Sequence, residues 1–313
     1  MMRRAVEGIV PVMLTPMDNG GAIDWEGLEN LVDWYIEHRS DALFAVCQSS
    51  EMQRLTLDEH VALSKRVVEL AGSKLPVISS GHISTDLDEQ IAELKAVADT
   101  GVDALVLVTN RLDPDNKGTD AFRAHLGALL AALPSDMPLG LYECPAPYRR
   151  LLSDDEFKLC RDSGRFVVLK DVSCDLETVQ RRVALAEDSP LAVINANAAI
   201  AFDAMRSGSK GFSGVFTNFH PDLYAELYAR RTEHGGEIEE LKVFLALAAM
   251  AEPMGYPKLA KLYHNRLGTF AEPGSRVVQY DVEETHWAAG VLLDHIQEGT
   301  EYWRERLHAS RNK

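Results

Sequence analysis

Residues 166–171 read Phe-Val-Val-Leu-Lys-Asp, and residues 138–143 read Pro-Leu-Gly-Leu-Tyr-Glu. These two stretches are the strongest indication of the fold. Both stretches are almost continuously apolar and end in polar residues, which is typical of strands in a parallel sheet that is covered on both faces. Side chains alternate along a strand, so Lys170 and Tyr142 lie on the face that does not carry the bulky leucines. We expect the leucines to contact helices and these two polar side chains to point inward.

Similar apolar stretches recur along the chain, and helical patterns such as residues 24–39 and 57–71 separate them. The expected strands are residues 8–14, 41–47, 75–81, 102–109, 138–143, 166–170, 191–195 and 210–214. An eightfold strand-helix alternation predicts an α/β protein with a (β/α)8 TIM barrel. The alternative is an open doubly wound sheet. It is disfavoured because Thr15-Pro16-Met17-Asp18, and no glycine-rich dinucleotide turn, follows the first strand.

The barrel is expected to occupy residues 1–231, and residues 232–313 are expected to form a C-terminal helical extension packed on it. Helical patterns in this part cover residues 237–251, 257–267 and 283–307. No Ser/Gly linker separates the two parts, so we predict one compact body.

Charge and composition limit the possible partners of this chain of 313 residues. The chain carries 32 basic and 48 acidic residues, a net charge of −16, which disfavours nucleic acid and anionic membranes as partners. The longest apolar run, residues 243–251, is far shorter than the roughly 20 residues of a membrane-spanning helix. The four cysteines and ten histidines show no metal-binding spacing, so we expect a cytoplasmic protein without metal or cofactor. Cysteines near strand ends, such as Cys144 and Cys174, are interpreted as small buried fillers.

A lysine that faces a barrel interior is costly unless it is neutralised, paired or reactive. Its usual pKa is about 10.4, and loss of hydration lowers it, so Lys170 can attack a carbonyl as a neutral amine. The alternative is that Lys170 pairs with a buried carboxylate. Tyr142 is either an acid/base group or a core aromatic whose hydroxyl is hydrogen-bonded.

Five groups of residues resemble landmarks of the dihydrodipicolinate synthase / N-acetylneuraminate lyase family, in the family's order and spacing. They are Ile9-Val10-Pro11 with Thr15-Pro16, Ile23-Asp24 with Trp34, Leu55-Thr56-Leu57-Asp58-Glu59-His60, Leu141-Tyr142-Glu143-Cys144-Pro145, and Leu169-Lys170-Asp171-Val172-Ser173-Cys174-Asp175. The resemblance extends over roughly residues 8–228. It implies a (β/α)8 barrel with a C-terminal helical region, usually tetrameric, that acts on 2-oxo acids through a lysine imine.

The resemblance implies that Lys170 forms the imine and that Tyr142 relays protons to and from the bound 2-oxo acid. It also implies a carboxylate-binding loop at residues 47–51, whose Ser49 and Ser50 N–H groups would hold the 2-oxo acid. The residues expected to bind substrate are Gln48, Ser49, Ser50, Arg149, Asn197 and Ser213.

Several positions depart from the family pattern. Gln48 replaces a hydroxyl that usually continues the tyrosine's proton relay, and residues 109–112 lack the tyrosine that members often supply across a subunit contact. Pro147 stands where synthase members carry an arginine, with Arg149 close by. Residues 195–198, Asn-Ala-Asn-Ala, lack the carboxylate that sialic acid lyases carry there. These departures disfavour dihydrodipicolinate synthesis and sialic acid cleavage.

The expected function is that of a carbon-carbon or carbon-oxygen lyase, a class I aldolase acting on pyruvate or a related 2-oxo acid, with dehydration of a keto-deoxy sugar acid as a close variant. The expected partner is this small molecule, and the expected assembly is a homo-oligomer, a dimer or a tetramer. The rival hypothesis is a catalytically silent paralogue that binds a small carboxylic acid. A phosphate-binding barrel enzyme is a weaker alternative, suggested by the glycines of residues 208–214.

Overall fold

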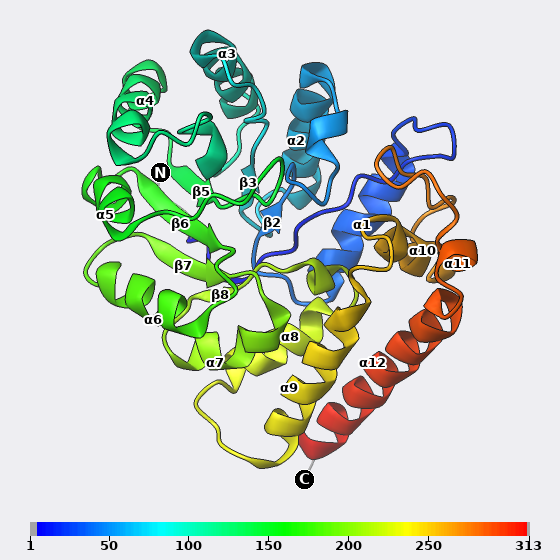
Figure 1. The fold of residues 1–313 in the computed structure, drawn as a ribbon. Helices are drawn as coiled ribbons and strands as arrows, with labels where there is room; N and C mark the ends of the chain where they lie inside the picture. The colour runs from blue at the N-terminus through cyan, green and yellow to red at the C-terminus, as the bar shows by residue number, and fades with distance from the viewer. Residues whose placement is uncertain (1–4, 312–313) are drawn as a thin grey trace.

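The computed structural model describes residues 5–311 and contains a closed ring of eight parallel strands (Figure 1). The strands are β1 (Gly8–Ile9), β2 (Leu43–Phe44), β3 (Val77–Ser79), β4 (Ala104–Val108), β5 (Leu139–Tyr142), β6 (Phe166–Asp171), β7 (Ala192–Asn195) and β8 (Gly211–Phe212). Their order is β1-β8-β7-β6-β5-β4-β3-β2, and a parallel bridge between Val12 and Phe44 closes the ring. The predicted (β/α)8 barrel is therefore confirmed, although each strand except β6 is shorter than the apolar stretch that predicts it.

A helix follows each strand and covers the outside of the ring. These helices are α1 (Trp25–Glu37), α2 (Leu57–Ala71), α3 (Leu87–Ala98), α4 (Thr119–Ala132), α5 (Asp154–Asp162), α6 (Leu176–Leu185), α7 (Ala201–Arg206) and α8 (Pro221–Ala229). The local sequence determines where several of these helices begin. Thr56 and Ser153 form capping boxes with Glu59 and Glu156, which satisfy N–H groups that the first helical turn leaves without partners.

The side-chain alternation of the central strands separates an inner core from an outer one. Leu139, Leu141 and Leu169 belong to a cluster that packs against α4 and α5, whereas Val168 and Tyr142 belong to the cluster that fills the barrel. The expectation that the leucines contact helices is thus correct. The inner cluster continues into residues of the C-terminal helices, so barrel and extension share one core.

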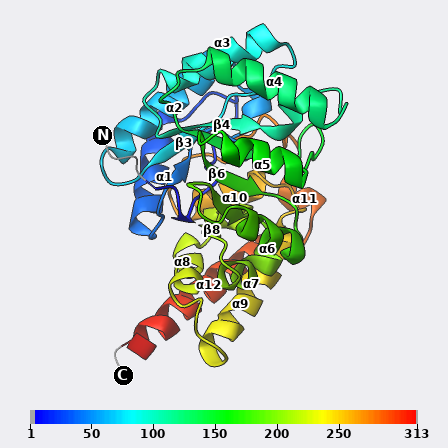
Figure 2. The same cartoon turned by 90° about the vertical axis from the view of Figure 1, so that its left-hand side faces the viewer.

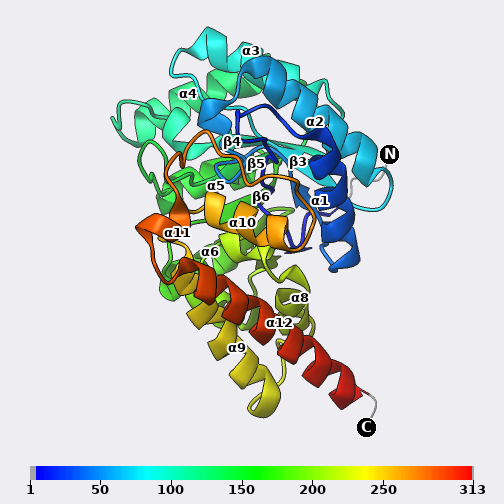
Figure 3. The same cartoon turned by 90° about the vertical axis from the view of Figure 1, so that its right-hand side faces the viewer.

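The C-terminal region forms α9 (Gly236–Ala248), α10 (Lys258–Arg266), α11 (Val282–Thr285) and α12 (Ala289–Arg311). Figures 2 and 3 show α9 and α12 side by side below the barrel, with α10 lying between them and the ring. The prediction of one continuous helix over residues 283–307 is wrong. The chain breaks between α11 and α12, where Arg266 binds Glu283 on one side of the break and Asp294 on the other.

No helix within residues 5–311 combines the length and the apolar character that crossing a bilayer requires. The same residues contain no group of three or more His, Cys, Asp or Glu side chains arranged to hold a metal ion.

Candidate active site

Lys170 and Tyr142 lie side by side at the C-terminal ends of β6 and β5. The two residues are directly paired in the parallel register. Lys170 also contributes to the lining of a small chamber inside the ring, together with Val168 and Ser213. The C-terminal ends of barrel strands are where catalytic groups of this architecture gather.

Lys170 is buried without a counter-ion. Its side chain forms no ion pair within residues 5–311, and only 7% of the residue is exposed. The Nζ atom lies 4.4 Å from the centre of the Tyr142 ring and 5.9 Å from that of Phe44. Burial lowers the pKa of Lys170, and the nearby Cys47, Cys144 and Glu252 only oppose this shift. The amine is therefore neutral, and nucleophilic, at a lower pH than an ordinary lysine.

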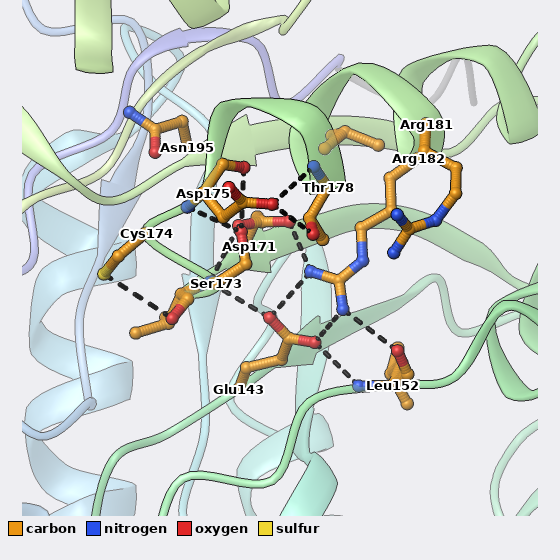
Figure 4. Close-up of polar contacts among 12 residues, drawn as sticks. Glu143, Leu152, Asp171, Ser173, Cys174, Asp175, Thr178, Arg181, Arg182 and Asn195 are labelled. Atoms are coloured by element: carbon orange, nitrogen blue, oxygen red, sulfur yellow. Dashed lines mark hydrogen bonds and ion pairs between the residues drawn. The ribbon is translucent and has the colours of Figure 1, made fainter.

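A buried charge cluster behind the strand ends fixes their position (Figure 4). Arg182 of α6 donates to both carboxylate oxygens of Glu143, at 2.5 and 2.9 Å, and also to Asp171. Glu143 in turn accepts from the N–H groups of Leu152 (2.8 Å) and Val172 (3.0 Å). These acidic residues directly follow Tyr142 and Lys170, so the cluster holds both strand ends and the loops that leave them. Arg182 engages both of these carboxylates, so neither pairs with Lys170.

The phenol of Tyr142 points to the thiol of Cys144. Burial raises the pKa of Tyr142, and its hydroxyl hydrogen-bonds Cys144. The Cys144 sulfur lies 3.6 Å from the Gln48 side-chain oxygen and 3.9 Å from Gln53 Nε2. Gln48 thus connects to Tyr142 through this thiol. Cys174, by contrast, is exposed and lines the cavity described below, so the interpretation as a buried filler is wrong for this residue.

The loop of residues 47–51 is tied into a tight turn by one hydroxyl. Ser50 Oγ accepts from the Cys47 N–H (2.6 Å) and donates to the Cys47 carbonyl (2.7 Å). The Ser50 hydroxyl therefore both donates and accepts hydrogen bonds within the loop. Within residues 5–311 the N–H groups of Ser49 and Ser50 have no hydrogen-bond acceptor, so they remain available to an anion.

An open cavity of about 640 Å³ lies over Lys170 and Tyr142. Three of the expected binding residues, Gln48, Ser49 and Asn197, line it, whereas Ser50 is fully buried and does not. Ser213 lies in the chamber inside the ring, and its hydroxyl donates to the Val10 carbonyl at 2.8 Å. Arg149 does not line the cavity, because its guanidinium binds the carbonyls of Val172 (3.1 Å) and Ser173 (3.4 Å).

Two further polar residues of the cavity, Tyr256 and Glu252, come from the segment between α9 and α10 and were missed by the sequence analysis. The Tyr256 hydroxyl accepts from Asn218 Nδ2 at 3.0 Å and hydrogen-bonds Ser49. Glu252 faces the open cavity, yet the surrounding protein raises the pKa of its carboxyl, while Lys170 has the opposite effect. No periodic pattern signals either residue. The local hint is that Glu252 directly follows the apolar stretch of residues 243–251, with Tyr256 four residues further on.

The chain is thus a barrel protein whose sixth strand carries, at its C-terminal end, a lysine that forms no ion pair with any described residue and that lies below an open cavity. Residues 5–257 match the model of the Dihydrodipicolinate synthetase family, and the chain belongs to this family. A 4-hydroxy-tetrahydrodipicolinate synthase of Alkalilimnicola ehrlichii is 31% identical over 244 residues, which cover 78% of this chain and 81% of the relative. One from a Jannaschia species is 28% identical over 276 residues, 88% of this chain and 86% of the relative.

Among solved structures, dihydrodipicolinate synthase from Acinetobacter baumannii, crystallised with pyruvate, is similar with a TM-score of 0.82 and 25% identity. The match covers 95% of this chain and 99% of the other. Membership places the chain among the Schiff-base, pyruvate-dependent lyases and aldolases.

Proposed function

We propose that this protein is a class I lyase that forms an imine between Lys170 and pyruvate or a related 2-oxo acid. The proposal is carried by one observation: Lys170 is buried without a counter-ion from any described residue, and it lines a cavity beside Tyr142. Burying an amine in this way is unfavourable for stability, and a chemical role accounts for it.

In the proposed reaction, the neutral amine of Lys170 adds to the C2 carbonyl of the 2-oxo acid, and water leaves as the imine forms. The Ser49 and Ser50 N–H groups hold the carboxylate. The protonated imine then accepts the electron pair of the C3–C4 bond as that bond breaks, while the C4 hydroxyl gives its proton to a base and an aldehyde departs. The enamine left behind is protonated at C3, and water releases pyruvate. Tyr142 is the proposed proton carrier.

Arg149 and Gln48 have indirect parts in this proposal. Arg149 ties residues 172 and 173 in place rather than touching substrate. The Gln48 side-chain oxygen accepts a hydrogen bond from the Cys144 thiol and so orients this thiol beside Tyr142. Asn197 and Ser213 remain proposed substrate contacts, with the Asn197 side-chain oxygen already accepting from the Ala199 N–H at 2.9 Å.

The second candidate is the synthase reaction itself, which the names of the relatives favour. The ring nitrogen and two carboxylates of its product require an aldehyde that carries both an amino group and a carboxylate. Loss of water from a keto-deoxy sugar acid and silent binding of a carboxylic acid are the remaining alternatives. All except the silent paralogue use the same imine.

Incubation with pyruvate and borohydride tests the proposal. We expect reduction to fix one pyruvate-derived group per chain and peptide mapping to place it on Lys170, because the imine is the species that borohydride reduces. Pyruvate or borohydride alone provides the control. The absence of an adduct with pyruvate and with several longer 2-oxo acids would support the silent paralogue instead.

A Tyr256→Phe variant tests whether a second phenol takes part in proton transfer. Ser49 and Asn218 hold the Tyr256 hydroxyl at the cavity. We expect its loss to slow exchange of the pyruvate methyl protons with deuterated water about 100-fold, a usual contribution of acid-base groups. Nuclear magnetic resonance measures this exchange without a second substrate. Borohydride trapping should persist.

The matched control for this variant is Tyr228→Phe, which removes a phenol from α8 outside the cavity. We expect wild-type exchange from the control. Equal exchange rates in both variants would exclude Tyr256 from proton transfer.

The remaining properties proposed for the protein are a dimeric or tetrameric assembly and a cytoplasmic location without metal or cofactor. The four free cysteines are consistent with a reducing compartment. Sedimentation equilibrium would determine the oligomeric state.

A further inference from the structure

The wall of the cavity around Lys170 is largely apolar and built from small side chains. Three segments supply most of it: residues 196–199 after β7, residues 214–216 after β8, and residues 246–257 at the end of α9 and beyond. Its apolar members include Ala196, Ala199, Val215, Phe216, Ala246 and Ala249. From this wall we infer that the aldehyde which leaves or joins the imine carries an apolar, aromatic-sized body. This inference rests on the proposed function and names its substrate class.

Charged groups in the cavity are few and badly placed for a second anionic reactant. Within residues 5–311 only Lys170, Glu252 and Arg54 contribute charge to the lining. Lys170 is consumed in the imine, and Glu252 would repel a carboxylate. Arg54 is exposed, and Arg149, which does not itself line the cavity, binds the backbone carbonyls of Val172 and Ser173. An aldehyde with its own carboxylate therefore has no buried cation to bind.

Polar groups are also too few for a polyhydroxylated reactant. The uncharged polar side chains of the lining are Gln48, Ser49, Gln53, Tyr142, Cys174, Asn197 and Tyr256. Several are already engaged, since Ser49 binds Tyr256, Tyr142 and Gln53 contact Cys144, and the Asn197 oxygen caps η3 (Ala198–Ile200). A sugar chain would leave hydroxyls without partners in this cavity, which strongly disfavours its binding.

The cavity is large enough for both parts of such a substrate. An apolar cavity of about 150 Å³ holds benzene, whereas this one measures about 640 Å³. One wall is also rigid, because Phe216 is fully buried and stacks on Phe219 with ring centres 4.4 Å apart. A preformed apolar wall with few polar groups is the usual form of a site for a hydrophobic ligand.

The reaction is then cleavage of a 4-hydroxy-2-oxo acid with an aryl or similar apolar group at C4, or the reverse addition. In cleavage, the C4 hydroxyl loses its proton, the C3–C4 bond breaks, and its electron pair enters the protonated imine. The aromatic aldehyde leaves, and protonation at C3 with hydrolysis restores pyruvate and the lysine. No oxidant or reductant is required.

Aldol addition of pyruvate to a set of aldehydes tests this inference. Benzaldehyde and 2-naphthaldehyde represent the apolar class, glyceraldehyde the hydroxylated class and glyoxylate the anionic class. We expect kcat/KM for the aromatic aldehydes to exceed that for the other two by about tenfold or more, measured as product formed by mass spectrometry. A higher kcat/KM for glyceraldehyde or glyoxylate would overturn the inference, and so would a pyruvate adduct that reacts with none of the aldehydes. Both results would leave the proposed imine intact. Failure to trap pyruvate on Lys170 would overturn both.

A pair of alanine variants checks that the apolar wall makes the selection. Ala199→Asp places a carboxylate on the lining, and Ala124→Asp makes the same change on the exposed side of α4. We expect Ala199→Asp to raise KM for benzaldehyde about tenfold, with pyruvate still trapped on Lys170, and Ala124→Asp to keep the wild-type KM. Equal KM values for benzaldehyde in the two variants would contradict the assignment of this wall.

Discussion

The Lys170→Met variant is expected to form no borohydride-stable adduct with pyruvate and to lose turnover by about 1,000-fold or more, because removing a covalent nucleophile eliminates the reaction route itself. Methionine is close to lysine in length and fills the same space without an amine. Intact mass and peptide mapping after trapping measure the adduct, and product formation measures turnover.

The same substitution should make the protein more stable. Lys170 is buried without a counter-ion and its pKa is lowered by loss of hydration. Replacing it removes a buried polar group that costs about 1 to 3 kcal/mol. Chemical denaturation of the variant should therefore show a higher free energy of unfolding than that of the wild type.

The gain in stability should depend on pH in a definite direction. The folded-state pKa of Lys170 lies below the unfolded value of about 10.4. Between these two values the unfolded wild-type chain binds a proton that the folded chain does not, so wild-type stability rises with pH. The advantage of Lys170→Met should be largest below this window and should shrink as the pH approaches the unfolded value.

The control is Lys65→Met, which removes an exposed lysine of α2. It should retain both the adduct and the turnover. Trapping of pyruvate on another lysine in the Lys170→Met protein would show that Lys170 is not the imine-forming residue.

The second large effect is expected from Arg182→Leu, which leaves two buried carboxylates without their counter-ion. The side chains of Glu143 and Asp171 have no exposed surface, and both bind Arg182 (Figure 4). Removing one partner of a buried ionic cluster costs about 3 to 5 kcal/mol. Denaturant unfolding should show this loss. Trapping at Lys170 should also weaken, since the cluster holds the ends of β5 and β6.

The loss caused by Arg182→Leu should diminish at acidic pH. Burial already raises the pKa of Glu143, and Arg182 opposes that shift, so the variant should raise it further. Above the unfolded value of about 4.3, the folded variant keeps a proton that the unfolded chain releases. Its stability therefore falls as the pH rises through this range and recovers as the pH is lowered toward the unfolded value.

The neighbouring Arg181 provides a matched control, because it pairs with Asp154 at the surface, where the two side chains are 50% and 42% exposed. Surface ion pairs contribute little, so Arg181→Leu should change the free energy of unfolding by about 0.5 kcal/mol or less. If Arg182→Leu costs no more than Arg181→Leu, the buried cluster does not stabilise the strand ends.

Local patterns were sufficient to predict the inward lysine. The alternation within Phe166–Asp171 and Leu139–Tyr142 assigns each side chain to one face, and two adjacent parallel strands bring Lys170 beside Tyr142. Gln48 and Ser49 were expected beside them because the family resemblance implies a carboxylate-binding loop at residues 47–51, and loops that leave the C-terminal ends of strands meet on one face of the barrel. The alternative that Lys170 pairs with a buried carboxylate required a contact across elements, and no pattern along the chain decides such a contact.

Three features depended on contacts between distant residues. The break after α11 arises where Arg266 binds on both sides of it, although the helical pattern of residues 283–307 continues through this point. Arg149 is drawn to the loop after β6. Tyr256 reaches the cavity because Asn218 and Ser49 hold it there.

Hydrophobic periodicity and polar strand ends are properties of neighbouring residues, so they were enough to predict the barrel and the pair Lys170 and Tyr142. The folded structure was needed to show that Lys170 has no counter-ion among residues 5–311, that Tyr256 and Glu252 enter the cavity, and that the cavity wall is largely apolar. The physical reason is that hydration, charge pairing and cavity shape depend on side chains that meet only after folding, from segments far apart along the chain.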